Sequence, residues 1–207
     1  MERDSLGATK KSSPTRISII CSTGDIYCIG PRRFSSQRKR HGFEVDLIFL
    51  RATTFWGQSK RRFNAYFDED DLSESVYQQL LDICRDSAIV GFSVWTHQVE
   101  QVTRVTRRLQ KELSSLIIWG GIHPTSFPEE SLQVVEAICM GEGEVSFLQL
   151  AQAVREGRDY KKARGFWFRE GGKLIRNREQ PLVNDLDDFP FLDFEYEAHF
   201  IDDQGKL

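Results

Sequence analysis

The sequence predicts an α/β fold: a three-layer sandwich in which a five-stranded parallel sheet carries helices on both faces. Short runs of β-branched and other apolar residues alternate along the chain with longer amphipathic stretches, which is the pattern of βαβ units. The strand candidates are apolar throughout rather than alternating, as in strands that are buried on both faces. With 207 residues, 40% of them hydrophobic, the chain is long enough to bury such a core and to carry an appendage.

The strands and helices can be placed in order along the chain. The predicted strands are RISIICS, FEVDLIFL, AIVGFSV, SLIIWGG and VEAICMG, at residues 16–22, 43–50, 88–94, 115–121 and 135–141. A helix is predicted over 97–114, because Val and Leu recur there every three or four residues and form one apolar stripe. The same reasoning predicts helices over 71–85 and after Gly143. The connection over 51–70 exceeds the usual length of such loops, so we expect a partly ordered excursion near a ligand.

The pattern changes after Gly157. Two extended runs flank a Glu-Gly-Gly turn in ARGFWFREGGKLIRN, which predicts a β-hairpin. From Gln180 onward, acids, prolines and aromatics mix without a helical or strand period, as in a linker that packs against a neighbouring domain. We therefore expect a disordered tail over 1–14, a ligand-binding domain over 15–158, a hairpin appendage over 159–180 and a linker over 181–207.

The composition argues against several other classes of protein. No run approaches the roughly 20 apolar residues that span a bilayer, and the first residues hold no apolar stretch typical of a signal peptide. We therefore expect a cytoplasmic protein without a membrane span. The four cysteines show no CxxC or CxxxCxxC spacing, which argues against a zinc or iron-sulfur site in this chain and favours free thiols.

Basic residues concentrate near the beginning of the chain. Residues 1–62 hold 13 Lys and Arg against 5 Asp and Glu, with clusters in RRFSSQRKRHG at 32–42 and KRRF at 60–63. Such clusters can bind nucleic acid, but no aromatic stacking platform or known nucleic-acid motif accompanies them. We interpret them as a solvated helix face and an exposed loop, and we expect no nucleic-acid partner.

Four loops rich in glycine and hydroxyl residues follow predicted strands, at 22–30, 93–97, 120–125 and 141–144. In an open parallel sheet, ligands bind beyond the carboxyl ends of the strands, and small residues let the backbone approach them closely. We therefore expect these loops to converge on one ligand. The candidate binding residues are Ser22, Thr23, Asp25, Tyr27, Gly30, Ser93, Trp95, Thr96, His97, Gly120, Gly121, His123, Gly141, Glu142 and Gly143.

Part of this pattern has a purely local interpretation. Ser126 and Glu129 have the spacing of a capping box, with Pro128 in the first helical turn, so this stretch starts a helix. The cap leaves the Gly120-Gly121 pair unexplained. The pair favours a bulky ligand against the backbone, with tight packing between helix and sheet as the alternative.

The loop after the fifth strand and the two edge histidines also allow two interpretations. Glu144 complements the dipole of the following helix, whereas Glu142 binds a ligand or is a solvated surface carboxylate. His97 and His123 lie near helix starts, where a lone histidine is a local hydrogen-bonding group or a ligand-binding residue. His41 and His199 lie outside the four loops.

The first loop, CSTGDIYCIG at 21–30, fits two cofactors. Its Ser-Thr-Gly resembles the turn with which flavodoxins hold the phosphate of FMN, and Trp95 would then stack on the flavin. Its D-x-Y-x-x-G differs by one residue from the D-x-H-x-x-G loop that ligates cobalt in one group of cobalamin-binding domains. Against FMN, Pro31 would interrupt the helix expected directly after a phosphate loop.

Five signatures occur in the order GFSVWT, IIWGGIHPTSFPEE, ICMGEGEVSFLQL, GFWFREGGKLIRN and PLVNDLDDFPFLDF. Together they resemble the N-terminal cobalamin-binding domain of radical S-adenosylmethionine enzymes, from about residue 16 to the end of the chain. The resemblance implies a Rossmann-like, flavodoxin-like domain. Cobalamin would be its cofactor, bound with the nucleotide tail displaced and threaded into the sheet edge.

The related methionine-synthase group has the signatures D-x-H-x-x-G, S-x-L and GG. They correspond here to Asp25-x-Tyr27-x-x-Gly30, Ser93-x-Trp95 and Gly120-Gly121. The resemblance implies that Ser93 hydrogen-bonds the base of the tail and that the two glycines leave room for the tail to pass. Changing Gly121 to Val is then expected to abolish binding and keep the fold. Tyr27 stands where the cobalt-ligating His would be, so cobalamin would bind without His ligation.

A second departure concerns catalysis. The family's chemistry needs a CxxxCxxC iron-sulfur motif in a following barrel, and no cysteine follows Cys139. The iron-sulfur cluster and S-adenosylmethionine would therefore belong to a missing C-terminal barrel, acting in cis or in trans. The implied reaction is a radical methylation, with methylcobalamin as methyl donor, or a rearrangement. Two alternatives stay open: a flavodoxin-like FMN-binding protein, and a cofactor-free interaction module with the same fold.

Overall fold

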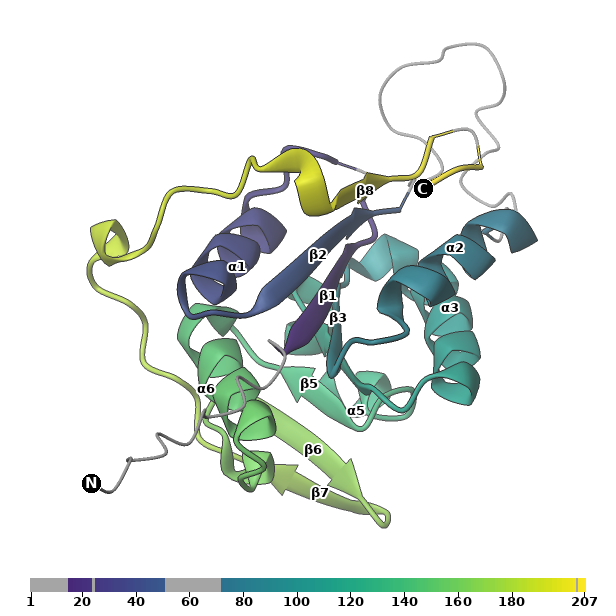
Figure 1. Ribbon diagram of the computed structural model, residues 1–207. Helices are drawn as coiled ribbons and strands as arrows, with labels where there is room; N and C mark the ends of the chain where they lie inside the picture. Colours follow the sequence, from purple (N-terminus) through teal and green to yellow (C-terminus); the bar gives the residue numbers. More distant parts are fainter. Residues whose placement is uncertain (1–14, 24, 51–71, 204) are drawn as a thin grey trace, which may run out of the picture.

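The computed structural model describes residues 15–23, 25–50, 72–203 and 205–207, and a single mixed sheet forms its centre (Figure 1). The strand order is β7-β6-β5-β4-β3-β1-β2-β8. Parallel pairing joins β1 (Arg16–Cys21), β2 (Glu44–Phe49), β3 (Ile89–Ser93), β4 (Leu116–Gly120), β5 (Ala137–Cys139) and β8 (His199–Ile201). Antiparallel pairing adds β6 (Phe166–Glu170) and β7 (Lys173–Arg176).

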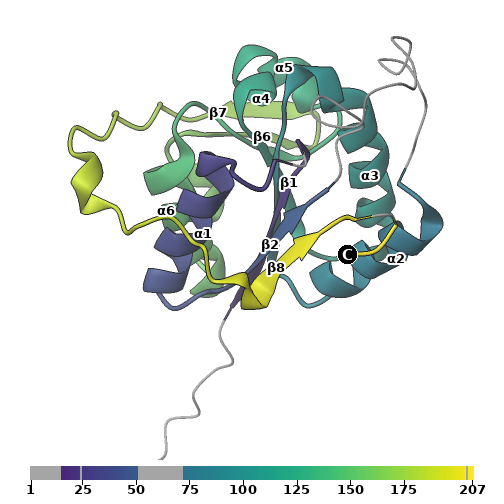
Figure 2. The ribbon, with the colours of Figure 1, turned by 90° about the horizontal axis from the view of Figure 1, so that it is seen from above.

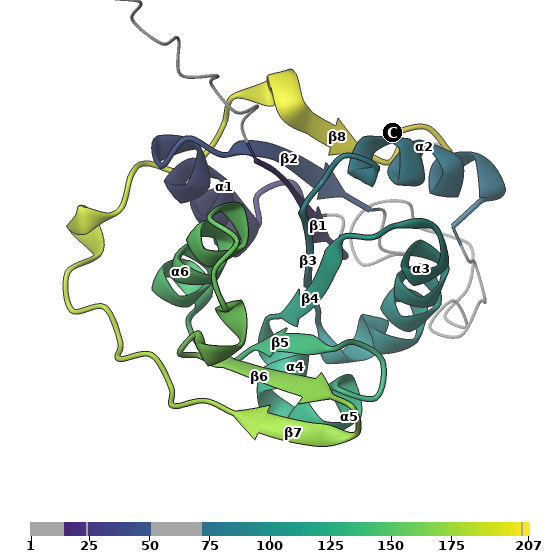
Figure 3. The same ribbon diagram turned by 60° about the horizontal axis from the view of Figure 1, so that its bottom comes forward.

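Two layers of helices enclose the sheet, which confirms the predicted α/β sandwich. Figure 3 shows one layer formed by α1 (Ile29–Arg40) and α6 (Gly143–Arg155), and the opposite layer by α2 (Glu74–Cys84) and α3 (Val99–Glu112). The apolar stripe of α3 is buried as its periodicity predicts. The remaining helical segments are α4 (Ile122–Ser126), α5 (Pro128–Ser131), η2 (Thr96–Gln98), η3 (Tyr160–Lys162), η4 (Leu186–Asp188) and η5 (Tyr196–Ala198).

Each face of the sheet has its own apolar core. One cluster packs Ile20, Val90 and Trp119 of the strands against α2 and α3, and the other packs Ile19 and Leu47 against α1 and α6. Since alternate residues of a strand point to opposite faces, the central strands must be apolar on both sides. This explains the continuous apolar runs in the sequence.

The sheet has eight strands, so the predicted number of five was too low. The hairpin β6–β7 is not a separate appendage, because β6 pairs with β5, with Ala137 opposite Phe168. At the other edge β8 pairs with β2, with Leu47 opposite His199. Both additions cover edges that the five-stranded sheet would leave with unpaired backbone groups. A strand of three residues such as β8 is too short to show a period in the sequence.

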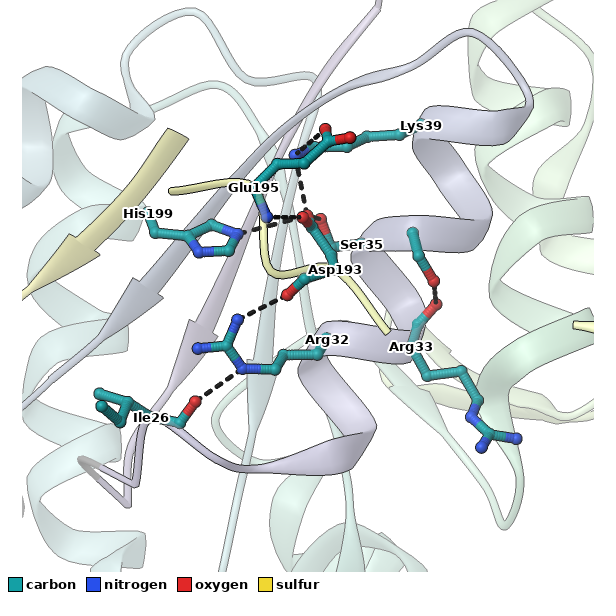
Figure 4. A network of polar contacts seen from close by, with 9 residues as sticks. Ile26, Arg32, Arg33, Ser35, Lys39, Asp193, Glu195 and His199 are labelled. Atoms are coloured by element: carbon teal, nitrogen blue, oxygen red, sulfur yellow. Dashed lines mark hydrogen bonds and ion pairs between the residues drawn. The ribbon is translucent and has the colours of Figure 1, made fainter. Parts of the chain in front are cut away.

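The segment between β7 and β8 runs around the outside of α6 and α1 (Figure 2). Asp193, which is 5% exposed, attaches this segment to α1 through polar contacts. One carboxylate oxygen accepts a hydrogen bond from Ser35 and lies 2.8 Å from Lys39 Nζ and 3.3 Å from His199 Nε2. The other accepts the backbone N–H of Glu195 at 2.9 Å. Figure 4 shows these side chains converging on Asp193, so the predicted linker is built into the domain.

Most of the basic cluster at 32–42 lies in α1. We predicted that this helix face is solvated, but two of its arginines are buried. Arg32 and Arg38 are 1% and 0% exposed. Arg32 donates to the backbone oxygens of Ile26 and Asp193 (Figure 4). Arg38 donates to the carbonyl oxygen of Glu144 at 3.0 Å, and its guanidinium lies over aromatic rings. Two of these arginines therefore hold the fold together.

Two local predictions about helix starts were wrong. Ser126 ends α4, and Phe127 is the N-cap of α5 without a side-chain cap, so no capping box forms. Pro128 does begin α5, as predicted. Pro31 lies in the first turn of α1, where a backbone N–H has no helical partner, so it does not interrupt this helix. The predicted tail over 1–14, the excursion over 51–70 and the KRRF cluster lie outside the described residues.

Candidate functional site at the carboxyl edge of the sheet

The carboxyl ends of three central strands lie in one row. Cys21 of β1 is the register partner of Ser93 in β3, and Ser93 is the partner of Gly120 in β4. The loops that follow these strands are therefore neighbours, as the sequence predicted. Between β1 and β3 the direction of strand order reverses, which is where open α/β sheets bind their ligands.

The loop after β1 is held by its own hydrogen bonds. Asp25 Oδ1 accepts the backbone N–H of Tyr27 at 2.9 Å, and Thr23 Oγ1 accepts that of Asp25 at 3.2 Å. Tyr27 lies at the tip with 73% of its surface exposed. A Cβ added to Gly30 would meet no other atom within 4 Å, so the backbone there faces open space. This loop presents an exposed phenol on a fixed backbone.

Ser22 has an internal role. Its hydroxyl donates to Gln98 Oε1 at 2.7 Å, and Gln98 Nε2 donates back to the Ser22 carbonyl at 2.6 Å. Both side chains are buried. The pair joins the end of β1 to the turn η2. Gln98 was not predicted from the sequence, because a single glutamine carries no pattern that distinguishes a buried position from an exposed one.

The loop after β3 exposes three candidates. Trp95 is 47% exposed, and Thr96 and His97 of η2 are exposed beside it. The Trp95 and His97 rings meet edge to face with their centroids 6.3 Å apart. Ser93 is half-buried at the strand end, next to the loop after β4. This part of the edge offers aromatic surface together with polar groups.

The two glycines after β4 differ in what they require. Gly121 has φ +98°, and an added Cβ would lie 3.0 Å from the Val94 carbonyl oxygen, so its need for glycine comes from the protein itself. At Gly120 an added Cβ would make only ordinary contacts, the nearest at 3.5 Å to Cys139 Cβ. The close contact at Gly121 is with the backbone of the loop after β3 and not with a helix. Gly120 needs no glycine for packing.

His123 is a buried polar group at this edge. It is 2% exposed and lies against Trp119 and Phe127. Neither ring nitrogen has a hydrogen-bond partner among the described residues, and burial lowers the pKa of the ring below its usual value. The side chain is therefore neutral at pH 7 and keeps an unused capacity for a hydrogen bond.

The loop after β5 is joined to the loop after β4. Thr125 Oγ1 accepts the backbone N–H of Gly141 at 3.2 Å and donates to the Gly121 carbonyl at 2.9 Å. Gly141 has φ +63°, and an added Cβ there would meet no atom within 4 Å. Glu142 is exposed as the N-cap of α6. Gly143 is buried, and a Cβ there would overlap the Phe34 ring, so its requirement for glycine is internal.

Exposed apolar side chains gather at this edge. In the described part of residues 15–158, every exposed large hydrophobic side chain lies in the loops or first helical turns after β1, β3 and β4: Tyr27, Ile29, Trp95, Ile122 and Phe127, here termed the apolar rim. Exposed apolar side chains at the ligand edge of a parallel sheet favour a binding site there. Ile29, Ile122 and Phe127 were not predicted from the sequence, although they lie in or directly beside the glycine loops, which was a usable signal.

The side chains and the open backbone at this edge can accommodate a ligand. The apolar rim flanks backbone that is open at Gly30 and Gly141, and small polar groups lie among the aromatic rings. Ligand sites typically combine apolar surface with a few polar groups that fix orientation. The arrangement suits a large ligand with an extended apolar face.

Comparisons with known proteins bear on which ligand this is. Residues 15–151 match the B12 binding domain family. An uncharacterized methyltransferase of Pyrococcus horikoshii is 27% identical over 116 residues, covering 53% of this chain and 25% of the relative. The anaerobic magnesium-protoporphyrin IX monomethyl ester cyclase of Synechocystis is 32% identical over 108 residues, covering 50% of this chain and 22% of the relative.

Two solved structures share the fold. The cobalamin-dependent S-adenosylmethionine radical enzyme OxsB with aqua-cobalamin bound has a TM-score of 0.66 at 17% identity, covering 88% of this chain and 24% of that one. The radical S-adenosylmethionine methyltransferase TsrM of Kitasatospora setae, with cobalamin and a 4Fe-4S cluster bound, has a TM-score of 0.61 at 17% identity, covering 86% and 31%. The chain thus spans about a quarter of the curated relatives it matches.

The family match supports cobalamin over FMN for the loop at 21–30. It covers all four edge loops and most of the sheet that positions them. The match covers more than half of the chain, and the parallel strand pairing agrees with the fold of this family. The chain belongs to the B12-binding domain family, and its cofactor is cobalamin.

Proposed function

We propose that this chain is the cobalamin-binding part of a radical S-adenosylmethionine enzyme of the methyltransferase type. The observation that carries the proposal is the apolar rim around open backbone at the carboxyl edge of the sheet. The Pyrococcus horikoshii relative, which is named as a methyltransferase, and the TsrM structure favour this reaction class. A barrel with the iron-sulfur cluster and S-adenosylmethionine would follow in the same polypeptide. The alternatives are a barrel on a separate polypeptide, which would act in trans, and a rearrangement reaction in place of methyl transfer.

The residues at the edge fit cobalamin. The apolar rim would cover part of the corrin, and when bound the cofactor supplies a cobalt centre able to accept and donate a methyl group. Ser93 would hydrogen-bond the displaced tail, and Gly120 would leave room for it. Thr96, His97 and Glu142 are exposed and would contact polar substituents of the ring.

We also infer the domain limits and the setting of the protein. The match over residues 15–151 supports a cobalamin-binding unit over 15–158. The hairpin over 159–180 extends its sheet, and the segment over 181–207 would lead towards the barrel. Among the described residues no helix is both long and apolar enough to cross a bilayer. We place the protein in the cytoplasm, in keeping with its free cysteines.

Absorbance spectra test whether this part of the chain binds cobalamin by itself. The purified chain is incubated separately with hydroxocobalamin and with FMN, and each sample is then desalted. Retained corrin bands, shifted to a tail-displaced form, are expected. Retained flavin bands would instead support the flavodoxin alternative, and a colourless protein in both cases would support a cofactor-free module.

A substitution in the apolar rim tests the site. Changing Phe127 to Asp is expected to weaken cobalamin binding at least about tenfold, because burying one large apolar side chain contributes roughly 1.5–3 kcal/mol. The matched control is Leu174→Asp, since Leu174 is 40% exposed on β7, away from the edge loops. Equal affinities of the two variants would place the cofactor elsewhere.

Changing Tyr27 to Ala is expected to weaken cobalamin binding only modestly, by less than about tenfold. The phenol is 73% exposed and the loop backbone is held by Asp25, so the variant keeps the loop. Phe191→Ala, which alters a fully exposed ring in the C-terminal segment, is the control. Electron paramagnetic resonance of the cobalt(II) form should be the same in all three proteins. A changed splitting pattern in Tyr27→Ala would identify Tyr27 as a cobalt ligand and contradict this expectation.

A further inference from the structure

A buried pair of hydrogen bonds joins the turn after β3 to the end of β1. Gln98, the last residue of η2, is 5% exposed, and Ser22, directly after β1, is 2% exposed. Ser22 Oγ donates to Gln98 Oε1 at 2.7 Å, and Gln98 Nε2 donates to the Ser22 carbonyl oxygen at 2.6 Å. Because a buried amide is costly unless it is hydrogen-bonded, the two segments are held in this register.

The same serine also contacts the end of β3. Ser22 Oγ lies 2.9 Å from the Ser93 carbonyl oxygen, so its single hydroxyl proton is shared between this oxygen and Gln98 Oε1. Ser93 is the register partner of Cys21, the residue before Ser22. Strand order reverses between β1 and β3. The three polar groups therefore lie at the point of the sheet edge where ligands bind.

The turn after β3 is held at both ends and exposed in the middle. At its start, the Val94 N–H donates to the Gly120 carbonyl oxygen at 2.8 Å. At its end, the Gln98 N–H donates to the Trp95 carbonyl oxygen at 2.9 Å. The residues over 95–97 are exposed. The side chain of Gln98 therefore sets where these exposed residues lie relative to the end of β1.

We propose that Gln98 is a positioning residue for cobalamin, which fixes the turn over 95–97 against the end of β1 through its two hydrogen bonds to Ser22. The proposal rests on the proposed function, which places this turn against the corrin ring. Gln98 acts through the turn and not by contact with the ligand. A turn that is held before the ligand arrives does not have to be ordered on binding, so a loosened turn binds more weakly.

The variant Gln98→Met tests the proposal, because methionine keeps the length of the side chain and removes both hydrogen bonds. Cobalamin affinity is expected to fall about tenfold. The matched control is Gln110→Met at the opposite end of α3, where Gln110 Nε2 donates to the Val134 carbonyl oxygen at 2.9 Å. The affinity of the control should stay within about twofold of the parent. Urea unfolding of the cobalamin-free proteins establishes that both variants are folded.

A second ligand separates the turn from the nucleotide tail. Aquacobinamide has the corrin of cobalamin without this tail. Gln98→Met is expected to weaken the binding of both ligands by the same factor. Bound cobalamin should keep the spectrum of the tail-displaced form, because the Ser22 hydroxyl still donates to the Ser93 carbonyl oxygen. A loss of affinity confined to cobalamin would place the effect on the tail and overturn the proposal, as would undiminished affinity for both ligands.

A double-mutant cycle tests whether Gln98 acts through Ser22. Ser22→Ala is expected to weaken binding as well. Since both single variants remove the same hydroxyl bond, the loss in the double variant should be smaller than the product of the two single losses. Single losses that multiply would show that Gln98 acts by another route and would overturn the proposal. If Gln98→Met does not fold, unchanged affinity of Ser22→Ala has the same meaning.

Hydrogen exchange distinguishes failure of the proposal from failure of the proposed function. In the cobalamin-free protein, the backbone amides of residues 94–99 should exchange faster in Gln98→Met than in the parent, and Gln110→Met should match the parent. If the parent binds no cobalamin, the proposed function fails, and the exchange rates still establish whether Gln98 holds the turn. If the parent and Gln98→Met bind cobalamin equally well, the positioning role fails and the proposed function stands.

Discussion

Replacing Asp193 with Ala is expected to lower the free energy of unfolding by about 3 kcal/mol and to release the C-terminal segment from α1. The side chain is 2% exposed, and in its absence Ser35 and Lys39 lose their shared acceptor inside the protein, while His199 loses the carboxylate 3.3 Å from its Nε2 (Figure 4). Unpartnered buried donors cost far more than a lost surface ion pair contributes. The strand β8 depends on this anchor, since it contains only three residues.

Urea denaturation and limited proteolysis measure this effect. The Ala variant should unfold at lower urea and be cut earlier between residues 177 and 198. Asp187→Ala is the matched control, because Asp187 lies on the same segment with an exposed side chain. If both variants have the stability of the parent protein, Asp193 does not anchor the segment.

Acid should have the same effect as the substitution. Burial alone would raise the pKa of Asp193, but hydrogen bonds from Lys39 and Ser35 outweigh it and lower the pKa to about 2. The carboxylate therefore contributes stability that is fully present above the unfolded value of about 4 and is lost as the pH falls towards 2. Asp193→Asn should flatten the stability profile in this window. An unchanged profile would show that other carboxylates cause the acid sensitivity.

Changing Gly121 to Ala is expected to destabilise the fold by about 3 kcal/mol, even without cofactor. The backbone has φ 98° and ψ −165°, a region that is essentially restricted to glycine, and the added Cβ would lie 3.0 Å from the Val94 carbonyl oxygen. Gly121→Val adds bulk at the same point, so the structure predicts that this variant also loses stability, against the sequence-based expectation that it would keep the fold. Thermal and urea unfolding of the cobalamin-free protein measure the loss.

Gly120→Ala separates packing from binding. Its Cβ would make only ordinary contacts, so the stability should stay within about 1 kcal/mol of the parent. Cobalamin affinity should fall, because the proposed path of the tail passes this backbone. Equal stability of the two alanine variants would contradict the structural role of Gly121. Undiminished affinity in Gly120→Ala would contradict the path of the tail.

The parallel sheet and the four edge loops were predictable from the sequence. Strands such as 16–22 and 88–94 have apolar runs because both of their faces are buried. The apolar residues of α3 recur every three or four positions, which is the period of a helix with one buried face. Since parallel strands end at one edge, the loops at Ser93 and Gly120 had to meet. The recognisable order of signatures also identified the cofactor.

Contacts between distant segments were decided only by the tertiary structure. Whether Arg32 is buried depends on Asp193 and Phe194, which lie more than a hundred positions further along the chain. Which of two adjacent glycines is structural depends on the carbonyl of Val94 in another loop. A local sequence pattern indicates whether a residue lies in a helix or a strand and which face of that element it occupies. The burial of Arg32 and the backbone strain at Gly121 depend instead on segments that are distant in the sequence and come together only in the folded chain.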